Sequence, residues 1–263
     1  MEAKRVMSDK GESIAGTQSF RRVSALLREV AAAGQAGLRL SDLAARTSLE
    51  HSTAHRMLKV LLSERWLERD DATKKYFLGP LIFELGLCMP IKSDFRRAFQ
   101  PTLTKLAAET QDTVYLNVRS GFDFVCLARE EGSYPIRAML HDVGGRRPLG
   151  IGASGIALIM ELQDEQVDSV IRANASRFRY YGLADDKIAL ETVHLARRLG
   201  YALSRDLDVL GLSAIGMPIH NAAGQPFAAI SIAMTTARLS DERSKSLHDL
   251  MRQAVDKIER HFH

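Results

Sequence analysis

The segment "HSTAHRMLKVLL", which starts at His51, has polar side chains in its first turns and apolar side chains after them. The apolar residues Met57, Leu58, Leu61 and Leu62 recur at helical spacing and predict the buried face of a helix. Serine, threonine, histidine and arginine can form hydrogen bonds with base edges in the major groove of DNA. We therefore expect DNA contacts from the polar edge of this helix, at His51, Ser52, Thr53, His55, Arg56 and Lys59.

The same residues allow two other interpretations. His51 and His55 are four residues apart on one helix, a spacing that can bind zinc, but Ser52 stands where an HExxH motif requires glutamate. We therefore expect no metal site and no cofactor. Ser52 and Thr53 could also cap the helix, a role that is compatible with DNA contact.

Two further helices are predicted before this one. The first starts at Gln18 and ends at Gly34 and Gly37, and its apolar face is formed by Phe20, Val23, Leu26, Leu27 and Val30. Ser41 is predicted to cap a short second helix that ends at Thr47 and Ser48, and to lie beside the DNA. Two helices joined by a tight polar turn predict a helix-turn-helix, whose second helix enters the major groove.

A β-hairpin is predicted directly after these helices. Trp66 and Leu67 begin one strand, Asp70 to Thr73 form the turn, and "YFL" at residues 76–78 forms the second strand. Lys74 and Lys75 are expected on this wing, where they would bind the phosphate backbone without reading sequence. The pattern is typical of a winged helix-turn-helix.

Composition is consistent with a basic module joined to a neutral one. The 263 residues predict two domains, and 46% hydrophobic residues can fill two cores. Residues 1–80 hold 14 Lys and Arg against 10 Asp and Glu, whereas residues 81–263 hold 22 of each, so the net charge of +4 comes from the first third. Cys88 and Cys126 fit neither a disulfide framework nor a metal motif. With no membrane span and no secretory signal, the cytoplasm is the expected location.

The remaining chain predicts an α+β domain. "TVYLNVRS" and "FDFVCLARE" flank a Ser-Gly turn, and "SAIGMPIHN" and "FAAISIAMT" flank a second turn at Ala223 and Gly224. Helices are predicted over residues 153–173, 185–199 and 240–262. Between the modules, two helical stretches interrupted near Met89 and Pro90 predict a linker.

The segment "GIGASG" at residues 150–155 satisfies the GxGxxG pattern of dinucleotide-binding turns. The polar helix predicted after it is not the second buried strand that a Rossmann unit needs, so we expect no dinucleotide site. A helix that opens with small residues presents backbone N–H groups, which suits a carboxylate. Arg146 and Arg147 lie just upstream, although the glycines could instead serve only to pack the helix closely on a sheet.

Residues 16–262 resemble the IclR-type bacterial transcriptional regulators. The resemblance rests on the segments "HSTAHRMLKVL", "YFLGP" followed by "ELG", "RRLGYALS", "GLSAIGMPI" and "FAAISIA". It implies a flexible segment at 1–15, a winged helix-turn-helix DNA-binding domain at 16–80, a linker helix at 81–98 and a GAF-like effector-binding domain at 99–263. Residues that the resemblance and the helix-start argument place in the effector site are Ile136, Met139, Arg146, Ala153, Ser154, Gly155, Ser204, Leu212, Ala214, Ser231 and Ala233.

The effector site departs from the family pattern. Many members carry cysteine where this chain has Ala214, an acid at Ser204, serine at Ala233 and histidine at Ile151. Very small hydroxy- or keto-acids depend on several hydrogen bonds, so loss of these groups favours an effector with a carboxylate and an apolar body. An aromatic acid is the leading hypothesis.

The predicted function is a ligand-responsive transcriptional regulator that binds double-stranded operator DNA as a dimer or a dimer of dimers. Helix one and the linker helix are the expected dimer surfaces, and repression is favoured over activation. Two alternatives remain: a metabolite-sensing module without DNA binding, and an enzyme that acts on a small carboxylate. No GxSxG, P-loop or HExxH motif supports an enzyme.

Overall fold

The computed structural model describes residues 17–88, 94–183, 185–207 and 209–260. The chain divides into two compact units, residues 1–89 and 90–263. The predicted flexible segment 1–15 and the predicted helix break at Met89 and Pro90 lie outside the described residues. Within the described chain, no helix is long and apolar enough to cross a membrane.

The N-terminal unit has the helices and the hairpin that the sequence predicts. Its elements are α1 (Gln18–Ala33), a 3-10 turn (Gly34–Ala36), α2 (Leu40–Thr47), α3 (His51–Ser63), β1 (Leu67–Arg69), β2 (Tyr76–Leu78) and α4 (Pro80–Cys88). Leu26, Leu43 and Leu58, one from each of the first three helices, are fully buried against one another. The two strands pair antiparallel, with Leu67 opposite Leu78 and Arg69 opposite Tyr76, which confirms the wing.

The start of α2 differs from the prediction by one residue. The helix begins at Leu40, so Ser41 lies inside its first turn and is not the N-cap. Instead, the carboxylate of Asp42 accepts a hydrogen bond from the backbone N–H of Arg39 at 3.3 Å. Helix α3 begins at His51, and no side chain caps its first turn. Ser52 and Thr53 are therefore not used as caps.

The C-terminal unit is built on one six-stranded antiparallel sheet with the strand order β5-β4-β3-β8-β7-β6. The strands are β3 (Thr113–Ser120), β4 (Asp123–Glu130), β5 (Arg146–Pro148), β6 (Ala202–Arg205), β7 (Leu212–His220) and β8 (Pro226–Thr235). The helices are α5 (Asp94–Thr110), α6 (Gly152–Ala157), α7 (Asp164–Phe178), α8 (Asp186–Leu199) and α9 (Asp241–Glu259), with 3-10 turns at Arg179–Tyr181 and Thr236–Arg238. This α+β architecture confirms the predicted fold class.

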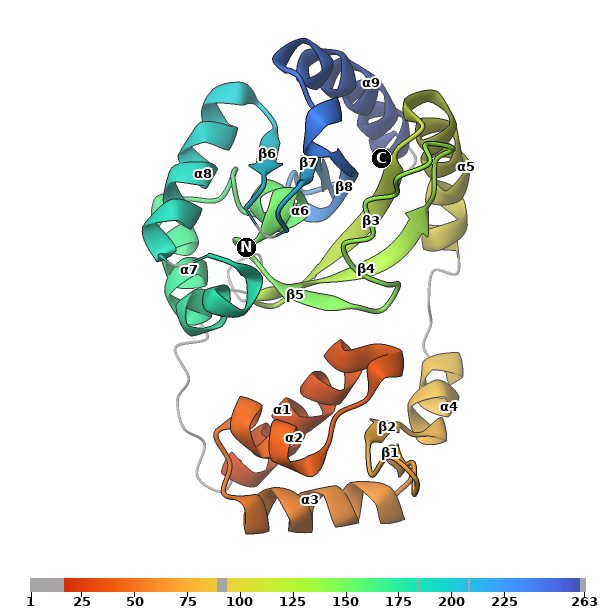
Figure 1. Ribbon diagram of the computed structural model, residues 1–263, viewed down its shortest axis with the longest axis vertical. Coiled ribbons are helices and arrows are strands. Elements are labelled where there is room, and N and C mark those ends of the chain that lie inside the picture. The colour runs from red at the N-terminus through yellow and green to blue at the C-terminus, as the bar shows by residue number, and fades with distance from the viewer. Residues whose placement is uncertain (1–16, 89–93, 184, 208, 261–263) are drawn as a thin grey trace, which may run out of the picture. The chain divides into compact units, whose positions relative to one another are not determined.

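Helices cover both faces of the sheet (Figure 1). On one face, α5 and α9 pack against alternate residues of the central strands, such as Leu116, Ile215 and Ile232. On the other face, α6, α7 and α8 pack against the intervening residues, including Tyr115 and Ala214. Successive strand residues point to opposite faces, so the two hydrophobic cores share the same strands. Phe99, Leu103 and Leu106 of α5 lie in the core that α5 and α9 form with the sheet. Most of α5 therefore belongs to the C-terminal unit and not to the linker.

The predicted helix over residues 153–173 is wrong, because the chain forms two helices there. Helix α6 ends at Ala157 and α7 begins at Asp164. Arg197 of α8 stabilises the turn between them, since its guanidinium donates hydrogen bonds to the carbonyls of Met160 and Leu162 at 2.7 and 2.6 Å. Such carbonyls would otherwise be unsatisfied at the end of a helix. A residue at least 35 positions further along the chain thus stabilises this turn.

Candidate functional site

The polar edge of α3 is exposed. Ala54, Leu58 and Leu61 turn inward, and the exposed residues of the opposite side are Ser52, His55, Arg56 and Lys59. This distribution follows from the helical period of 3.6 residues. The core fixes the orientation of α3, and its first two turns then present a continuous edge of hydrogen-bond donors and acceptors.

A second group of basic and polar residues surrounds a hollow of about 290 Å³ between α2, α3 and the wing. Four of the predicted DNA-binding residues line it, namely Ser41, His51, His55 and Lys74. Arg39 and Arg69 line the same hollow but were not among the predicted residues. The guanidinium of Arg69 lies 5.6 Å from the ring centre of Tyr76, which orients it on the wing. The sequence offers a signal for both arginines. Arg39 directly precedes the predicted second helix, and Arg69 ends the first strand of the predicted wing, so both flank elements that were predicted to contact DNA.

The structure gives different surroundings to three other predicted residues. Arg56, although exposed, and the half-buried Thr53 also border an apolar groove between α1 and α3. The ammonium group of Lys75 donates a hydrogen bond to the carbonyl of Ala36 at 2.7 Å and so ties the wing to the 3-10 turn that follows α1. Lys74 is more exposed and lies 3.9 Å from Asp71, a weak surface pair. Lys74 is therefore the freer of the two wing lysines to contact a phosphate.

The predicted effector-site residues of the sheet lie on one face, beneath α6. In the strand register, Ser204 is opposite Ala214, and Ala214 is opposite Ala233, so the three side chains form a row across β6, β7 and β8. Ser231 lies two residues before Ala233 on the same face, and Leu212 lies two residues before Ala214. Ala153 of α6 packs in the same hydrophobic core as Ala214 and Ala233. The register of β6, β7 and β8 thus places these residues together on one face of the sheet.

A chain of hydrogen bonds joins α6 to the sheet at this place. The hydroxyl of Ser154 donates to the hydroxyl of Ser231 at 2.8 Å and accepts from the side-chain amide of Asn117 at 2.8 Å. The amide oxygen of Asn117 lies 3.0 Å from Nε2 of His141. Asn117, Ser154 and Ser231 are all buried. Sequence reasoning missed Asn117 and His141, because no local motif marks them.

His141 belongs to the loop of residues 131–145, which connects β4 to β5. Its ring lies against Tyr115 and Phe124, with centroid distances of 4.6 and 5.7 Å. Burial, together with the positive charges of Arg147 and Arg129, lowers the pKa of His141 to about 3. The imidazole is therefore neutral near pH 7. The hydroxyl of Tyr115 anchors the loop, since it donates to the carbonyl of Ala138 and accepts from the N–H of Leu140, both at 2.9 Å.

The other predicted effector residues lie in less suitable surroundings. Arg146 is on β5, at the opposite edge of the sheet from Ser204, and its guanidinium is bound to Ser120 and Asp123 at 3.0 and 3.3 Å. Ile136 and Met139 on the loop are 60% and 47% exposed. A Cβ atom at Gly155 would lie 3.1 Å from the ring of Phe124, so close packing explains this glycine. Because α6 spans only six residues, the expected helix-dipole contribution to carboxylate binding is small.

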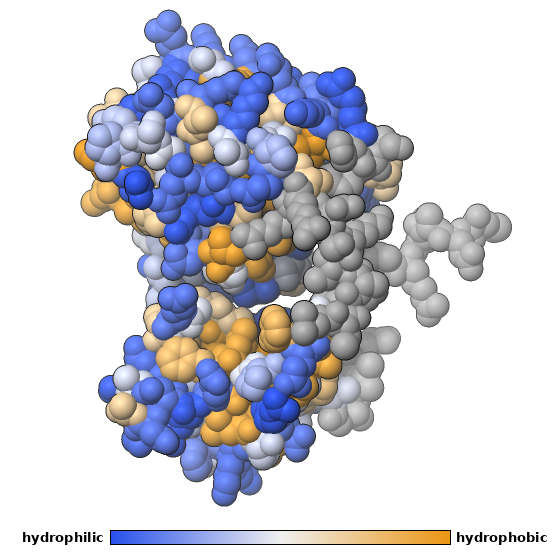
Figure 2. Space-filling model, turned by 90° about the vertical axis from the view of Figure 1, so that its right-hand side faces the viewer, coloured by the Kyte–Doolittle hydropathy of each residue, from blue (hydrophilic) through white to orange (hydrophobic). Residues whose placement is uncertain are grey.

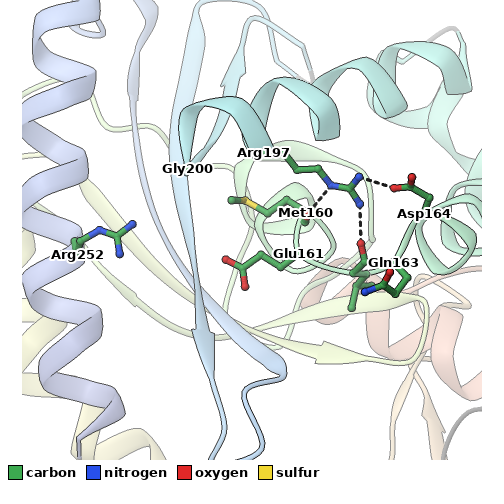
Figure 3. Close-up of a pocket in the computed structure, with 8 residues that line it drawn as sticks. Met160, Glu161, Gln163, Asp164, Arg197, Gly200 and Arg252 are labelled. Atoms are coloured by element: carbon green, nitrogen blue, oxygen red, sulfur yellow. Dashed lines mark hydrogen bonds and ion pairs between the residues drawn. The ribbon is translucent and has the colours of Figure 1, made fainter.

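A separate hollow of about 450 Å³ lies beside the turn that follows α6 (Figure 3). Arg197 reaches from α8 over this turn and also binds Asp164 at 2.5 Å, while Arg252 on α9 lies at the other side. None of the predicted effector residues lines this hollow. The Arg197 guanidinium binds Met160, Leu162 and Asp164 of the protein itself, which makes this site a poor anion receptor.

Glu161, which lines this hollow, takes part in an ionic cluster with His220 and Glu259. Nε2 of His220 lies 2.5 Å from Glu161, and Nδ1 lies 2.8 Å from Glu259. Burial would lower the pKa of His220, but the hydrogen bonds and charges of Glu161 and Glu259 together outweigh it and raise this pKa. The cluster joins the end of β7 to the end of α9 and to the turn after α6.

Because the folded protein holds the pKa of His220 above its unfolded value, the cluster stabilises the fold fully below about pH 6.5. This contribution is lost as the pH rises through the folded pKa. We therefore expect the free energy of unfolding of the wild type, relative to His220→Gln, to fall as the pH rises above about 6.5. Calorimetric unfolding of both proteins below and above this pH tests the expectation, and a constant difference between them contradicts it.

Within the described residues, no group of three or more His, Cys, Asp or Glu side chains is arranged to hold a metal ion. His51 and His55 border the basic hollow, with Arg39, Arg69 and Lys74 as neighbours, and positive neighbours disfavour a cation there.

Comparisons with known proteins cover both units. The model of the bacterial transcriptional regulator IclR C-terminal domain matches residues 91–260, and the model of the IclR helix-turn-helix domain matches residues 19–71. The HTH-type transcriptional repressor AllR of Salmonella typhimurium is 29% identical over 244 residues, which are 92% of this chain and 89% of the repressor.

Solved structures show the same fold. An IclR transcriptional regulator from Alicyclobacillus acidocaldarius aligns with a TM-score of 0.69 and 20% identity, over 92% of this chain and 97% of its own. An IclR homologue from Microbacterium hydrocarbonoxydans, complexed with 4-hydroxybenzoate, aligns with a TM-score of 0.65 and 22% identity over the same shares. The chain therefore belongs to the IclR family of bacterial transcriptional regulators, with an N-terminal DNA-binding helix-turn-helix unit and a C-terminal effector-binding domain.

Proposed function

We propose that this regulator is a repressor that binds its operator as a dimer or a dimer of dimers, and that a small carboxylic acid with an apolar, preferably aromatic, body changes its operator affinity. The observation that carries the DNA-binding part is the exposed polar edge of α3 beside the basic hollow between α2 and the wing. Repression is supported by the relatives, which are named as repressors. Operator DNA as the partner supports a cytoplasmic location.

The proposed effector site is the face of the sheet beneath α6. Its walls combine the buried Ala153, Ala214 and Ala233 with the hydroxyl groups of Ser154 and Ser231. An apolar lining with few polar groups suits a ligand that has a compact apolar body and one or two polar ends. The homologue from Microbacterium hydrocarbonoxydans, which is complexed with 4-hydroxybenzoate, supports an aromatic acid.

Apolar surface on the N-terminal unit supports the proposed dimer. A groove of about 690 Å³ lies between α1 and α3, and its walls include Phe20, Val23, Val60 and Trp66. Phe20 is 76% exposed and Phe83 of α4 is 69% exposed, although both are large and apolar. Apolar side chains also gather on the face of this unit that Figure 2 shows. Apolar patches of this kind mark association surfaces, and a two-fold dimer would match the two halves of a palindromic operator.

The proposed response to ligand is a shift between two arrangements of the dimer. An effector that binds one arrangement more tightly favours it, and operator affinity then changes by the difference in binding free energy, typically about 1 to 3 kcal/mol. That difference corresponds to a change of about 5- to 150-fold in operator affinity.

A mobility-shift titration with DNA from upstream of the gene tests this proposal. We expect a specific complex whose apparent affinity changes at least fivefold when one aromatic acid of a panel is added. A specific complex that no carboxylic acid changes would contradict the proposed effector class. Binding to operator and to scrambled DNA with equal affinity would contradict the proposed reading edge on α3.

A further inference from the structure

We propose that His141 is a specificity-determining residue of the effector site, and that its Nδ1 atom accepts a hydrogen bond from a hydroxyl or N–H group on the effector. This inference rests on the proposed carboxylate effector beneath α6, and it adds a second requirement to the ligand. The effector would then be a carboxylic acid that also carries a hydrogen-bond donor, such as a hydroxy-substituted aromatic acid.

The hydrogen-bond chain sets the tautomer of His141. Ser154 uses its hydroxyl hydrogen toward Ser231, so it accepts a hydrogen bond from the amide group of Asn117. The amide oxygen of Asn117 is therefore the atom that faces His141, and it can only accept. Nε2 of the neutral imidazole must then carry the hydrogen. Nδ1 is left with a lone pair, as a hydrogen-bond acceptor.

Nδ1 of His141 has no partner among the described residues although it is buried. A buried acceptor without a partner is destabilising by about 1 to 3 kcal/mol, and most such groups in folded proteins are satisfied. Protonation does not relieve the cost, since His141 stays neutral far below pH 7. A donor supplied by a ligand would satisfy this atom.

The neighbours of His141 connect it to the proposed effector site. Ala138, three residues earlier on the same loop, is buried in the core that contains Ala153, Ala214 and Ala233. Asn117 links the imidazole to Ser154 and through it to Ser231. The aromatic rings of Tyr115 and Phe124 hold the imidazole from its sides and restrict its orientation. The imidazole is thus a positioned acceptor and not a mobile side chain.

The test compares matched pairs of acids that differ by one hydroxyl group, measured by titration calorimetry with the full-length protein. The pairs are benzoate with 4-hydroxybenzoate, phenylacetate with 4-hydroxyphenylacetate, and propanoate with lactate. In the wild type we expect the hydroxy acid of at least one pair to bind about tenfold more tightly than its partner, the effect of one hydrogen bond to a buried acceptor. In His141→Gln, whose amide can still donate to Asn117 but offers no acceptor at the Nδ1 position, both acids of that pair should bind within twofold of each other.

Two further variants separate recognition from folding. His141→Phe keeps a ring against Tyr115 and removes both nitrogens, so it should also abolish the preference for the hydroxy acid while binding the parent acid. His248→Gln is the matched control, because His248 on α9 also lies against a tyrosine ring, that of Tyr201 at 5.1 Å, but is no part of the hydrogen-bond chain. It should keep the full preference.

The possible outcomes distinguish the two proposals. If acids bind but no pair shows a hydroxyl preference, or if the preference survives in His141→Gln, the role of His141 is overturned while the carboxylate effector stands. If none of the six acids binds the wild type, the proposed effector class fails and the inference about His141 fails with it.

Discussion

Replacing His55 and Arg56 together with alanine is expected to lower affinity for operator DNA by about 10- to 100-fold and to remove most of the discrimination between operator and scrambled DNA. Both side chains are exposed on α3, outside the buried face formed by Ala54, Leu58 and Leu61. The fold should therefore be unchanged. Fluorescence anisotropy with labelled operator and scrambled duplexes measures both effects.

Arg69→Ala provides the contrasting variant. Arg69 lies on the wing beside the basic hollow, where we expect it to contact phosphate and not a base. Its loss should weaken binding to both duplexes by a similar factor and reduce the slope of log affinity against log salt by about 1. Arg198→Ala, an exposed arginine of α8 in the other unit, controls for the change in net charge. Equal discrimination by the wild type and the α3 double variant would contradict the predicted reading edge.

Removing the carboxylate of Asp112 is expected to destabilise the C-terminal unit by about 2 to 4 kcal/mol. Asp112 is almost fully buried and binds two arginines, Arg238 at 2.9 Å and Arg243 at 2.7 Å. Both arginines also donate hydrogen bonds to the carbonyl of Thr110, so the cluster joins the end of α5 to the start of α9. In Asp112→Ala, two partly buried positive charges lose their shared partner. Because both arginines are partly exposed to solvent, the expected loss of stability lies in the lower part of the range for broken buried ion pairs.

Calorimetric unfolding of the full chain measures this effect, and the N-terminal unit supplies an internal control. Trp66 is the only tryptophan of the chain and packs beside the core of the N-terminal unit, so its fluorescence reports that unit. Its transition should be unchanged in Asp112→Ala. The matched control is Asp241→Ala, which breaks the surface pair with Arg205 and should have little effect. Similar destabilisation by the two variants would show that the buried cluster of Asp112 contributes no more to stability than the surface pair of Asp241.

Much of the fold follows from patterns within short segments. The 3.6-residue period placed α1, α3 and α9, and the alternation of apolar residues with turn residues between them placed the hairpins β1-β2, β3-β4 and β7-β8. These patterns are readable because each depends on residues within one or two turns of a helix or within one strand. The same locality explains why the polar edge of α3 could be predicted in detail.

The sequence by itself determined the two modules, the exposed polar edge of α3 and the set of small side chains on β6, β7 and β8. Only the tertiary structure decided which side chains come into contact. The register of β3 with β4 and β8, and the return of the loop over the sheet, bring His141 to Asn117 and Asn117 to Ser154, across 24 and 37 residues. Likewise, Arg197 of α8 binds the turn that follows α6, and the carboxylate of Asp123 binds the guanidinium of Arg146. These contacts depend on pairing between distant segments, where a shift of one residue would turn each side chain to the other face of the sheet.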